Sequence, residues 1–332
     1  MVAQIDSTYI KTRPWKLWSR IISYALFEGR PVTTRGRWIN PFVFAHFDIE
    51  KRLPITRKVI KPVFILGTGR SGTTILGIVL SMHREVGFLN EPKALWHSIY
   101  PDEDLIGSYN SSHARYRLNV EDASDAVVQA AHRIYSAYLS ASFSCRIVDK
   151  YPELIFRVPF VKSIFPDAKF LFLIRNGWDT CHSITNWSDR FGQKTQDKTY
   201  DWWGVNRRKW RLLMKEIVQT HGDLSVYTNE MNDWTNQTDM AAVEWVVSMR
   251  EGLSLLKHYP DDVMQVRYET LCMEPQKTLK QILEFLELAT DDSQFFQYAN
   301  STLRPSASRS TFELNKLITK PFLRTMHELG YE

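Results

Sequence analysis

Cysteine is scarce in this chain, and the few copies do not pair by spacing. Among 332 residues there are three, Cys145, Cys181 and Cys272, which lie far apart and form no C-x-x-C motif. An odd number of widely spaced cysteines gives neither a disulfide framework nor a zinc-binding pattern. The nine histidines also lack H-x-x-x-H spacing, so we predict no metal site. A reducing compartment fits this composition best.

Long apolar runs are also missing. No uninterrupted hydrophobic stretch approaches the ~18 residues of a membrane span, and the N-terminal residues lack the form of a signal peptide. Hydrophobic residues make up 44% and charged residues 24% of the sequence, which is typical of a globular protein with a sizeable core. We therefore expect a cytoplasmic protein.

A strong excess of charge is absent as well. The 42 Lys and Arg outweigh the 37 Asp and Glu by five, which favours anionic ligands but is too diffuse for a nucleic-acid surface. We predict no nucleic-acid partner, and a phosphorylated cofactor suits this balance.

Two regions differ in composition, and we divide the chain into residues 1–60 and 61–332. The first is rich in aromatic and basic residues and is predicted as an extension packed on or near the main domain. It contains a helical pattern with an apolar face and three basic residues: Trp15, Trp18, Ile22, Leu26, Lys11, Lys16 and Arg20. Two interpretations stay open for this helix: packing over the main domain, or weak peripheral contact of residues 11–30 with a membrane surface.

Strand and helix patterns alternate from residue 62 onwards. The run Val63 to Leu66 predicts a buried strand, followed by a glycine-rich turn and a helix over 75–80. Phe170 to Ile174 predicts a second strand with a helix after Gly177. Further patterns predict helices over 202–218 and 240–256 and a strand over 263–268. This alternation predicts an α/β fold with a buried parallel sheet.

The turn after the first strand has the composition of an anion-binding loop. Its sequence, Gly-Thr-Gly-Arg-Ser-Gly-Thr-Thr from Gly67 to Thr74, sits between strand and helix, where backbone N–H groups and the helix dipole favour phosphate-like groups. A nucleotide kinase or NTPase needs Lys after the second glycine, but Thr73 stands there. The cation is instead Arg70, inside the loop. A sulfuryl group carries less charge than a phosphoryl group, so such a cation can suffice without magnesium.

The loop resembles that of the sulfotransferases that use PAPS, 3′-phosphoadenosine 5′-phosphosulfate. In that family a P-loop variant with Lys or Arg before S-G-T-T holds the 5′-phosphosulfate. The resemblance assigns this task to Gly69, Arg70, Ser71, Gly72, Thr73 and Thr74. A second family motif, a strand ending in Arg with Ser eight residues later, grips the 3′-phosphate. Here FLFLIRNGWDTCHS supplies Arg175 and Ser183.

Further matches are similar to the tyrosylprotein and carbohydrate branches of the family and imply the catalytic residues. There a Glu beyond the loop helix is the general base, which places Glu91 in that role, with His83 and His97 as rivals. The motif Asp149-Lys150-Tyr151-Pro152 resembles a family motif whose Lys contacts the transferring group, so Lys150 inherits that contact, although its neighbours differ from the family pattern.

The C-terminal third contains looser matches. The segment VRYETLCMEP places Tyr268 against the cofactor, while Ser301 and Lys316 resemble residues that close over PAPS, Ser301 assisting catalysis. Two positions depart from the family pattern: Gly177 replaces a common Pro, and Trp187 replaces a basic residue of some relatives.

The resemblance implies a P-loop-like, three-layer α/β/α fold and sulfuryl transfer from PAPS, releasing PAP, to a hydroxyl or amine of a small-molecule or carbohydrate acceptor. The alternatives are a P-loop nucleotide kinase or NTPase, for which Asp149 is the candidate magnesium ligand, and a non-catalytic PAP- or PAPS-binding protein. We expect the acceptor pocket between His97 and Ala141 and on the helices after Trp202. Four aromatic residues there stack on the acceptor or belong to the core: Trp96, Tyr100, Tyr109 and Tyr116.

Overall fold

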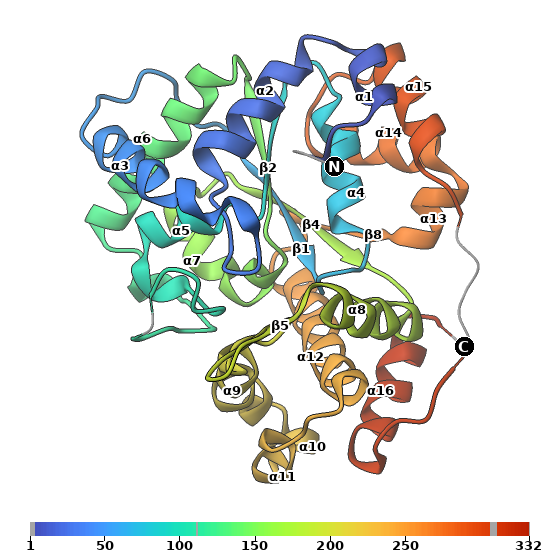
Figure 1. The fold of residues 1–332 in the computed structure, drawn as a ribbon. Coiled ribbons are helices and arrows are strands. Elements are labelled where there is room, and N and C mark those ends of the chain that lie inside the picture. Colours follow the sequence, from blue (N-terminus) through green and yellow to red (C-terminus); the bar gives the residue numbers. More distant parts are fainter. Residues whose placement is uncertain (1–3, 111, 306–310, 332) are drawn as a thin grey trace.

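A five-stranded parallel sheet forms the centre of the molecule (Figure 1). The computed structural model describes residues 4–110, 112–305 and 311–331. The strands follow the order β2-β3-β1-β4-β8, and their bounds are β1 Val63–Gly67, β2 Val86–Asn90, β3 Arg146–Lys150, β4 Lys169–Ile174 and β8 Val263–Arg267. Ile65 aligns with Lys150 on one side and with Leu171 on the other. The carboxyl ends of these strands therefore meet at one edge, where parallel sheets bind ligands.

Helices cover both faces of the sheet. Alternate strand residues point to opposite faces, so Ile65 and Leu171 belong to one core cluster while Phe64 and Phe170 belong to the other. The helices are α4 Thr73–Ser81, α5 Lys93–Ile99, α6 Asp125–Ala141, α7 Val158–Ile164, α8 Gly177–Phe191, α9 Arg208–Glu216, α10 Gly222–Ser225, α11 Thr228–Asn232, α12 Gln237–His258, α13 Tyr268–Met273, α14 Pro275–Phe285, α15 Ser293–Thr302 and α16 Lys316–Glu328. Short 3-10 turns occupy Pro101–Glu103, Val120–Asp122, Pro152–Arg157 and Val218–Thr220. The expected three-layer α/β/α fold is confirmed.

Residues 4–60 form a series of short helices, of which α2 and the π-helical turn after it lie beside the edge strand β2 (Figure 1). They are α1 Ser7–Thr12, α2 Lys16–Ile22, a π-helical turn Ser23–Phe27, a 3-10 turn Arg35–Ile39 and α3 Asn40–Glu50. Lys16 donates to the carbonyl of Val86 at 2.5 Å, and Arg20 donates to that of Phe88 at 2.9 Å. An edge strand leaves backbone groups unpaired, and these side chains satisfy two of its carbonyls.

The buried face of α2 is polar. Lys16 and Arg20 are only 1% and 2% exposed, whereas Trp15 and Trp18 are each 53% exposed. The apolar stripe of the helical pattern therefore faces outward, because the carbonyls of β2 attract the basic side chains. Arg20 also forms an ion pair with Glu28 at 2.6 Å.

Several elements differ from those expected. The strands beginning at Val63 and Phe170 and the helices that follow them are confirmed, as is the helix around 240–256. The helix predicted over 202–218 is wrong in its first part. Residues before Arg208 form a small antiparallel sheet of β5 Gln193–Lys194, β6 Thr199–Asp201 and β7 Gly204–Val205. Tyr268 begins α13 instead of ending a strand.

None of the helices in the described ranges combines the length and the apolar character needed to cross a bilayer. Within the same ranges, the three cysteines are free thiols, of which Cys181 and Cys272 are buried.

Candidate functional site

The glycine-rich loop connects β1 to the N-terminus of α4. Gly67 and Gly72 have φ of 142° and 96°, a region that side chains rarely adopt. Gly72 also lies against the ring of Tyr268, since a Cβ there would come within 2.2 Å of that ring. Arg70 has φ of 72° despite its side chain, and such outliers persist where the surroundings impose them. The loop therefore needs its glycines and presents Arg70 from a constrained backbone.

Arg70, Arg175 and Ser183 lie together at the carboxyl edge of the sheet. Arg70 Nε donates to Ser183 Oγ at 3.2 Å, and Arg175 donates to the Arg70 carbonyl at 3.1 Å. The Arg175 guanidinium lies over the ring of Tyr268, 4.6 Å from its centroid. Arg175 Nε is buried without a hydrogen-bond partner. A buried unpaired guanidinium donor suits an anionic ligand, because leaving such a group unsatisfied is costly.

Glu91 and Lys150 form an ion pair at the ends of the adjacent strands β2 and β3. Lys150 is 2% exposed, and the Glu91 side chain, at 40%, opens to the pocket. Glu91 has φ of 48°, and its N–H donates to the Lys150 carbonyl at 2.7 Å. Burial alone raises the pKa of Glu91, but Lys150 and then Lys93 outweigh that effect and lower it. The carboxylate is therefore ionised at neutral pH and able to accept a proton.

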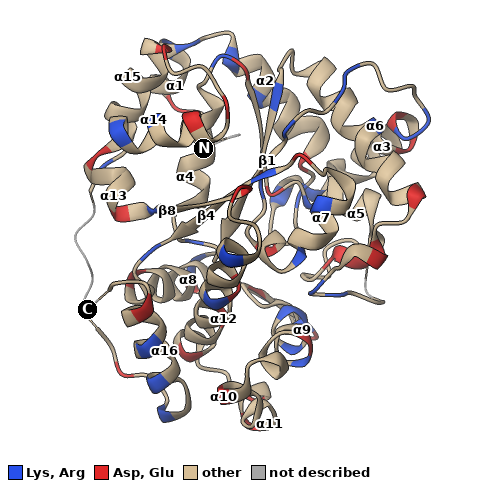
Figure 2. Cartoon of the chain, turned by 180° about the vertical axis from the view of Figure 1, so that it is seen from behind, with Lys and Arg blue, Asp and Glu red and all other residues tan. Residues whose placement is uncertain are grey.

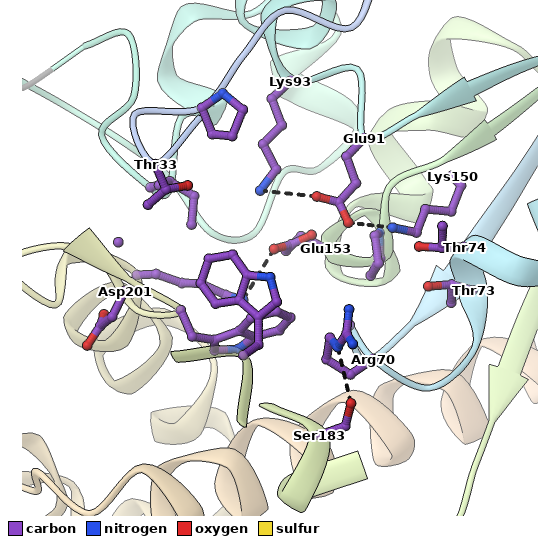
Figure 3. A pocket seen from close by; sticks show the side chains of 18 of the residues that line it. Thr33, Arg70, Thr73, Thr74, Glu91, Lys93, Lys150, Glu153, Ser183 and Asp201 are labelled. Atoms are coloured by element: carbon purple, nitrogen blue, oxygen red, sulfur yellow. Dashed lines mark hydrogen bonds and ion pairs between the residues drawn. The ribbon is translucent and has the colours of Figure 1, made fainter. Parts of the chain in front are cut away.

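These groups line one pocket of about 300 Å³. Figure 3 shows the Glu91 carboxylate with Arg70, Thr73 and Thr74 on one side and Thr33 and Asp201 on the other. The wall includes nine of the residues predicted from the sequence: Gly69, Arg70, Gly72, Thr73, Thr74, Glu91, Lys150, Arg175 and Ser183. The chain thus brings the loop, the Arg175/Ser183 pair and the Glu91/Lys150 pair to a single cavity.

Three charged residues that the sequence did not single out extend this site. Lys93 Nζ lies 3.8 Å from Glu91 Oε2, and Lys209 Nζ lies 3.2 Å from Glu153 Oε1. Burial would raise the pKa of Glu153, but Lys209 and Lys93 lower it to about 2. The pocket therefore has five Lys and Arg side chains against three carboxylates, a balance that favours an anion.

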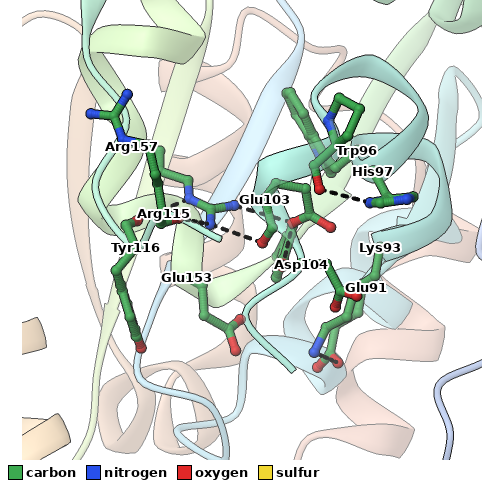
Figure 4. Close-up of polar contacts among 12 residues, drawn as sticks. Glu91, Lys93, Trp96, His97, Glu103, Asp104, Arg115, Tyr116, Glu153 and Arg157 are labelled. Atoms are coloured by element: carbon green, nitrogen blue, oxygen red, sulfur yellow. Dashed lines mark hydrogen bonds and ion pairs between the residues drawn. The ribbon is translucent and has the colours of Figure 1, made fainter. Parts of the chain in front are cut away.

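A buried polar cluster supports the wall behind Glu153 and Lys93 (Figure 4). Arg157 NH1 lies 3.2 Å from Glu103 Oε2, and the Tyr151 hydroxyl donates to the same oxygen at 2.7 Å. Burial raises the pKa of Glu103 to about 7. Because Lys93 and Glu153 flank this cluster, its packing holds the pocket wall in place.

The rivals to Glu91 lie elsewhere. His83 contacts the Ala289 carbonyl at 2.9 Å and is fully buried, and His97 contacts the Pro101 carbonyl at 2.9 Å. Neither is in the pocket wall, and burial lowers the pKa of both. Asp149, the candidate magnesium ligand, is also buried and accepts from Trp96 at 2.9 Å and Tyr135 at 2.6 Å. Its carboxylate is therefore occupied by hydrogen bonds to two core side chains.

Four predicted site residues are outside the pocket wall. Ser71 is buried and donates from Oγ to the Thr68 carbonyl at 2.5 Å. Tyr268 lies behind Gly72 and Arg175. Ser301 is exposed on α15 and donates to the Tyr298 carbonyl at 2.8 Å, and Lys316 is exposed at the start of α16. The structure thus does not bring Ser301 and Lys316 to Glu91, and the roles of all four stay predictions.

The pocket wall lies only partly in the region expected to hold the acceptor, which includes Lys209 on a helix after Trp202. Trp96 and Tyr116 are 1% and 0% exposed and belong to the core. The rings of Tyr100 and Tyr109 are partly buried and pack against that core. Of the described residues 97–110 and 112–141, only Ile106 reaches the wall. The wall instead contains Pro31 to Thr33 of the extension and Tyr200 to Trp202.

Trp202 packs directly on the anion loop. A Cβ at Gly69 would lie 2.4 Å from the Trp202 ring, and Trp202 Nε1 donates to Glu244 at 2.6 Å. Lys209 lies 4.8 Å from the centroid of the same ring. No local motif marks Trp202, Lys209 or the Pro31 segment, because each reaches the site through long-range packing. Of the residues missed, only Lys93 could have been predicted from the sequence, because it lies two residues after Glu91.

The sequence of this chain is similar to those of known proteins. A model of the sulfotransferase family matches residues 62–223 and 213–292. Protein-tyrosine sulfotransferase of Drosophila melanogaster is 24% identical over 277 residues, covering 81% of this chain and 47% of that protein. The chain spans about half the length of the first curated relatives it matches.

Solved structures with related folds were also found. The sulfotransferase domain of the Synechococcus PCC 7002 olefin synthase is 17% identical, with a TM-score of 0.49 over 84% of this chain and 98% of that one. A mouse sulfotransferase complexed with PAP is 13% identical, with a TM-score of 0.38 over 83% of this chain and 85% of that one.

Proposed function

Because the chain belongs to the sulfotransferase family, we propose that it transfers a sulfuryl group from PAPS to a hydroxyl or amine of a small-molecule or carbohydrate acceptor. One observation carries the proposal: the glycine loop, the Arg175/Ser183 pair and the Glu91/Lys150 pair line one pocket. Each has the chemistry that the reaction requires, and they come from separate strands and helices.

The proposed base is Glu91. Its ionised carboxylate accepts the proton of the acceptor atom as that atom attacks sulfur in line with the departing oxygen. Lys150 keeps the carboxylate ionised and orients it through their ion pair. Arg70 balances the negative charge that develops on the sulfuryl and bridging oxygens.

The proposed donor site fits the residues present. The loop from Gly69 to Thr74 offers backbone N–H groups at the start of α4 for the 5′-phosphosulfate. Arg175 and Ser183 offer a guanidinium and a hydroxyl for the 3′-phosphate, and the unpaired Nε of Arg175 supports this assignment. When bound, the donor supplies the sulfuryl group, and its remote phosphate fixes the reacting geometry.

Binding of PAP, the expected product, tests the proposal. Calorimetry should show a clear preference for PAP over AMP, since only PAP has a 3′-phosphate. Labelled PAPS incubated with fractionated extract should then yield a labelled acceptor. Equal affinity for PAP and AMP would refute the donor assignment. PAP selectivity without any labelled product would favour a non-catalytic binding protein.

A nucleotide kinase is the weaker alternative. Thr73 occupies the position of its Lys, and the Asp149 carboxylate is held in the core by Trp96 and Tyr135. The positions that such an enzyme uses therefore supply neither the loop lysine nor the magnesium-binding aspartate on which phosphoryl transfer relies.

We also propose a cytoplasmic location and a weak peripheral membrane contact through residues 11–30. The free thiols support a reducing compartment. Trp15, Trp18 and Ile21 are exposed beside Lys11 on this segment, a combination that suits an anionic lipid surface.

A further inference from the structure

A second hollow adjoins the acceptor side of the pocket. It has a volume of about 600 Å³, and Val32 and Tyr200 line both cavities. The two cavities are therefore neighbours, and an acceptor with its reactive atom at Glu91 would enter the second hollow by extending past these two residues. We name this second cavity the basic hollow, after the four cations in its wall: Lys198, Arg208, Arg211 and Lys215.

Among the described residues, none that lines the basic hollow is acidic. Arg208, Arg211 and Lys215 follow one another on α9 at helical spacing and so share a face, and Figure 2 shows the basic residues of α9. No ion pair involves any of the four cations within the described ranges. Arg208 and Arg211 instead donate to the carbonyls of His113 at 2.8 Å and Asn206 at 2.5 Å.

Unneutralised cations this close together repel one another. Arg208 Nε is in addition buried without a hydrogen-bond partner. An anionic group in the hollow would relieve the repulsion and pair with this donor. A surface that was merely solvated would be expected to mix both signs of charge, as most of this chain does, with 42 basic and 37 acidic residues.

From these contacts we infer that the acceptor is anionic: it carries a carboxylate, phosphate or sulfate group, distant from the reacting atom, that binds the basic hollow. This inference rests on the proposed sulfotransferase function and narrows its substrate class. The same chemistry fits an acidic carbohydrate or a small hydroxylated acid.

Calorimetry on the PAP-loaded protein tests the inference with two matched pairs of probes. The carbohydrate pair is maltotetraose and tetragalacturonate, and the small-molecule pair is 4-hydroxyphenethyl alcohol and 4-hydroxyphenylacetate. The anionic member of at least one pair should bind about 10-fold more tightly, and raising the salt from about 0.02 to about 0.15 M should weaken that preference. The pair that shows the preference identifies the acceptor skeleton.

The charge-reversal variant R211E/K215E should abolish the preference while PAP affinity stays unchanged. K280E, an exposed charge reversal on α14, should leave the preference intact. If R211E/K215E misfolds, K198E/K215E provides the same test from a different pair. Equal binding of both members in both pairs, or a preference that survives charge reversal, would overturn the inference while PAP selectivity still upheld the proposed function. Loss of PAP selectivity in the unaltered protein would refute both.

Discussion

At the scale of single residues, the left-handed backbone of Glu91 places a carboxylate between two lysines. Lys150 and Lys93 hold its pKa below the usual range, so the base is ionised over the whole neutral region. If Glu91 accepts the proton, Glu91→Gln should lower turnover by about 10²–10⁴-fold, as loss of a general base typically does. Steady-state kinetics together with PAP calorimetry provides the measurement, and PAP affinity should stay unchanged.

The pH profile gives a second view of the same residue. Since the pKa of Glu91 is lowered, activity should hold from neutral pH down to the ordinary range of a glutamate and fall only below it. Glu91→Gln should have no such acidic limb. Full activity in this variant would transfer the role of base to another group.

Arg175 is the residue proposed to bind the 3′-phosphate of the donor. Arg175→Ala should weaken binding of PAP by at least about 10-fold, because a charge-assisted hydrogen bond contributes roughly 1.5–3 kcal/mol, and ADP affinity should change little. Calorimetry with both nucleotides checks this expectation. Lys277→Ala, on exposed α14 and paired with Glu274, is the control. A parallel loss for PAP and ADP would place Arg175 away from the 3′-phosphate.

At the scale of elements, strand β3 carries a buried acid, Asp149, beside Lys150. Burial raises the pKa of Asp149 to about 7, while an unfolded chain titrates near 3.9. Between these values the folded state binds the extra proton, so this group lowers the free energy of unfolding as pH rises from about 4 to 7. Asp149→Asn removes the titration and keeps an acceptor for Trp96 and Tyr135.

The stability of Asp149→Asn relative to the unaltered protein should therefore increase with pH across that window, with a slope of up to about 1.4 kcal/mol per pH unit. Urea unfolding at several pH values measures it. The exposed Asp197→Asn should show no comparable trend. A difference that stays constant from pH 4 to 7 would contradict the raised pKa.

Elements with strong local patterns were predictable from the sequence, and those fixed by distant contacts were not. The apolar runs at Val63 and Phe170 and the loop glycines act locally, so β1, β4 and the helices after them were identified. Strands β2 and β3 have short apolar runs whose partners are remote in sequence. The sequence pattern that starts at Trp202 resembles that of a helix, but Trp202 lies in the turn between the paired strands β6 and β7.

The site shows the same division. Arg70, Arg175 and Glu91 belong to motifs with defined spacing, and all three line the pocket. Lys209 meets Glu153 and Glu244 only because α9, α12 and the turn after β3 pack together. The looser matches at Ser301 and Lys316 rested on sequence spacing across a long C-terminal segment, and both lie outside the pocket wall.

At the scale of the whole molecule, the extension presents an apolar and basic surface. Trp18 donates to the carbonyl of Ala141 at 3.2 Å, two residues from Phe143, which is 71% exposed. Vesicles with anionic lipid should therefore bind the protein weakly, and Trp15→Ser/Trp18→Ser should abolish sedimentation with them. Neutral vesicles should bind less. Equal sedimentation of the double variant would reject the membrane contact.

The side chains of α2 that cover the β2 carbonyls have a consequence for any shortened form of the protein. A chain starting at residue 61 would lose Lys16 and Arg20, leaving an open strand on which a second molecule could add its own. It would also lose the Glu28 carboxylate, which accepts the Asn90 N–H at 2.9 Å just before Glu91, and the part of the pocket wall formed by residues Pro31 to Thr33. Removing residues 1–60, to leave only the part of the chain that begins near the family match, should therefore cause both aggregation and loss of activity.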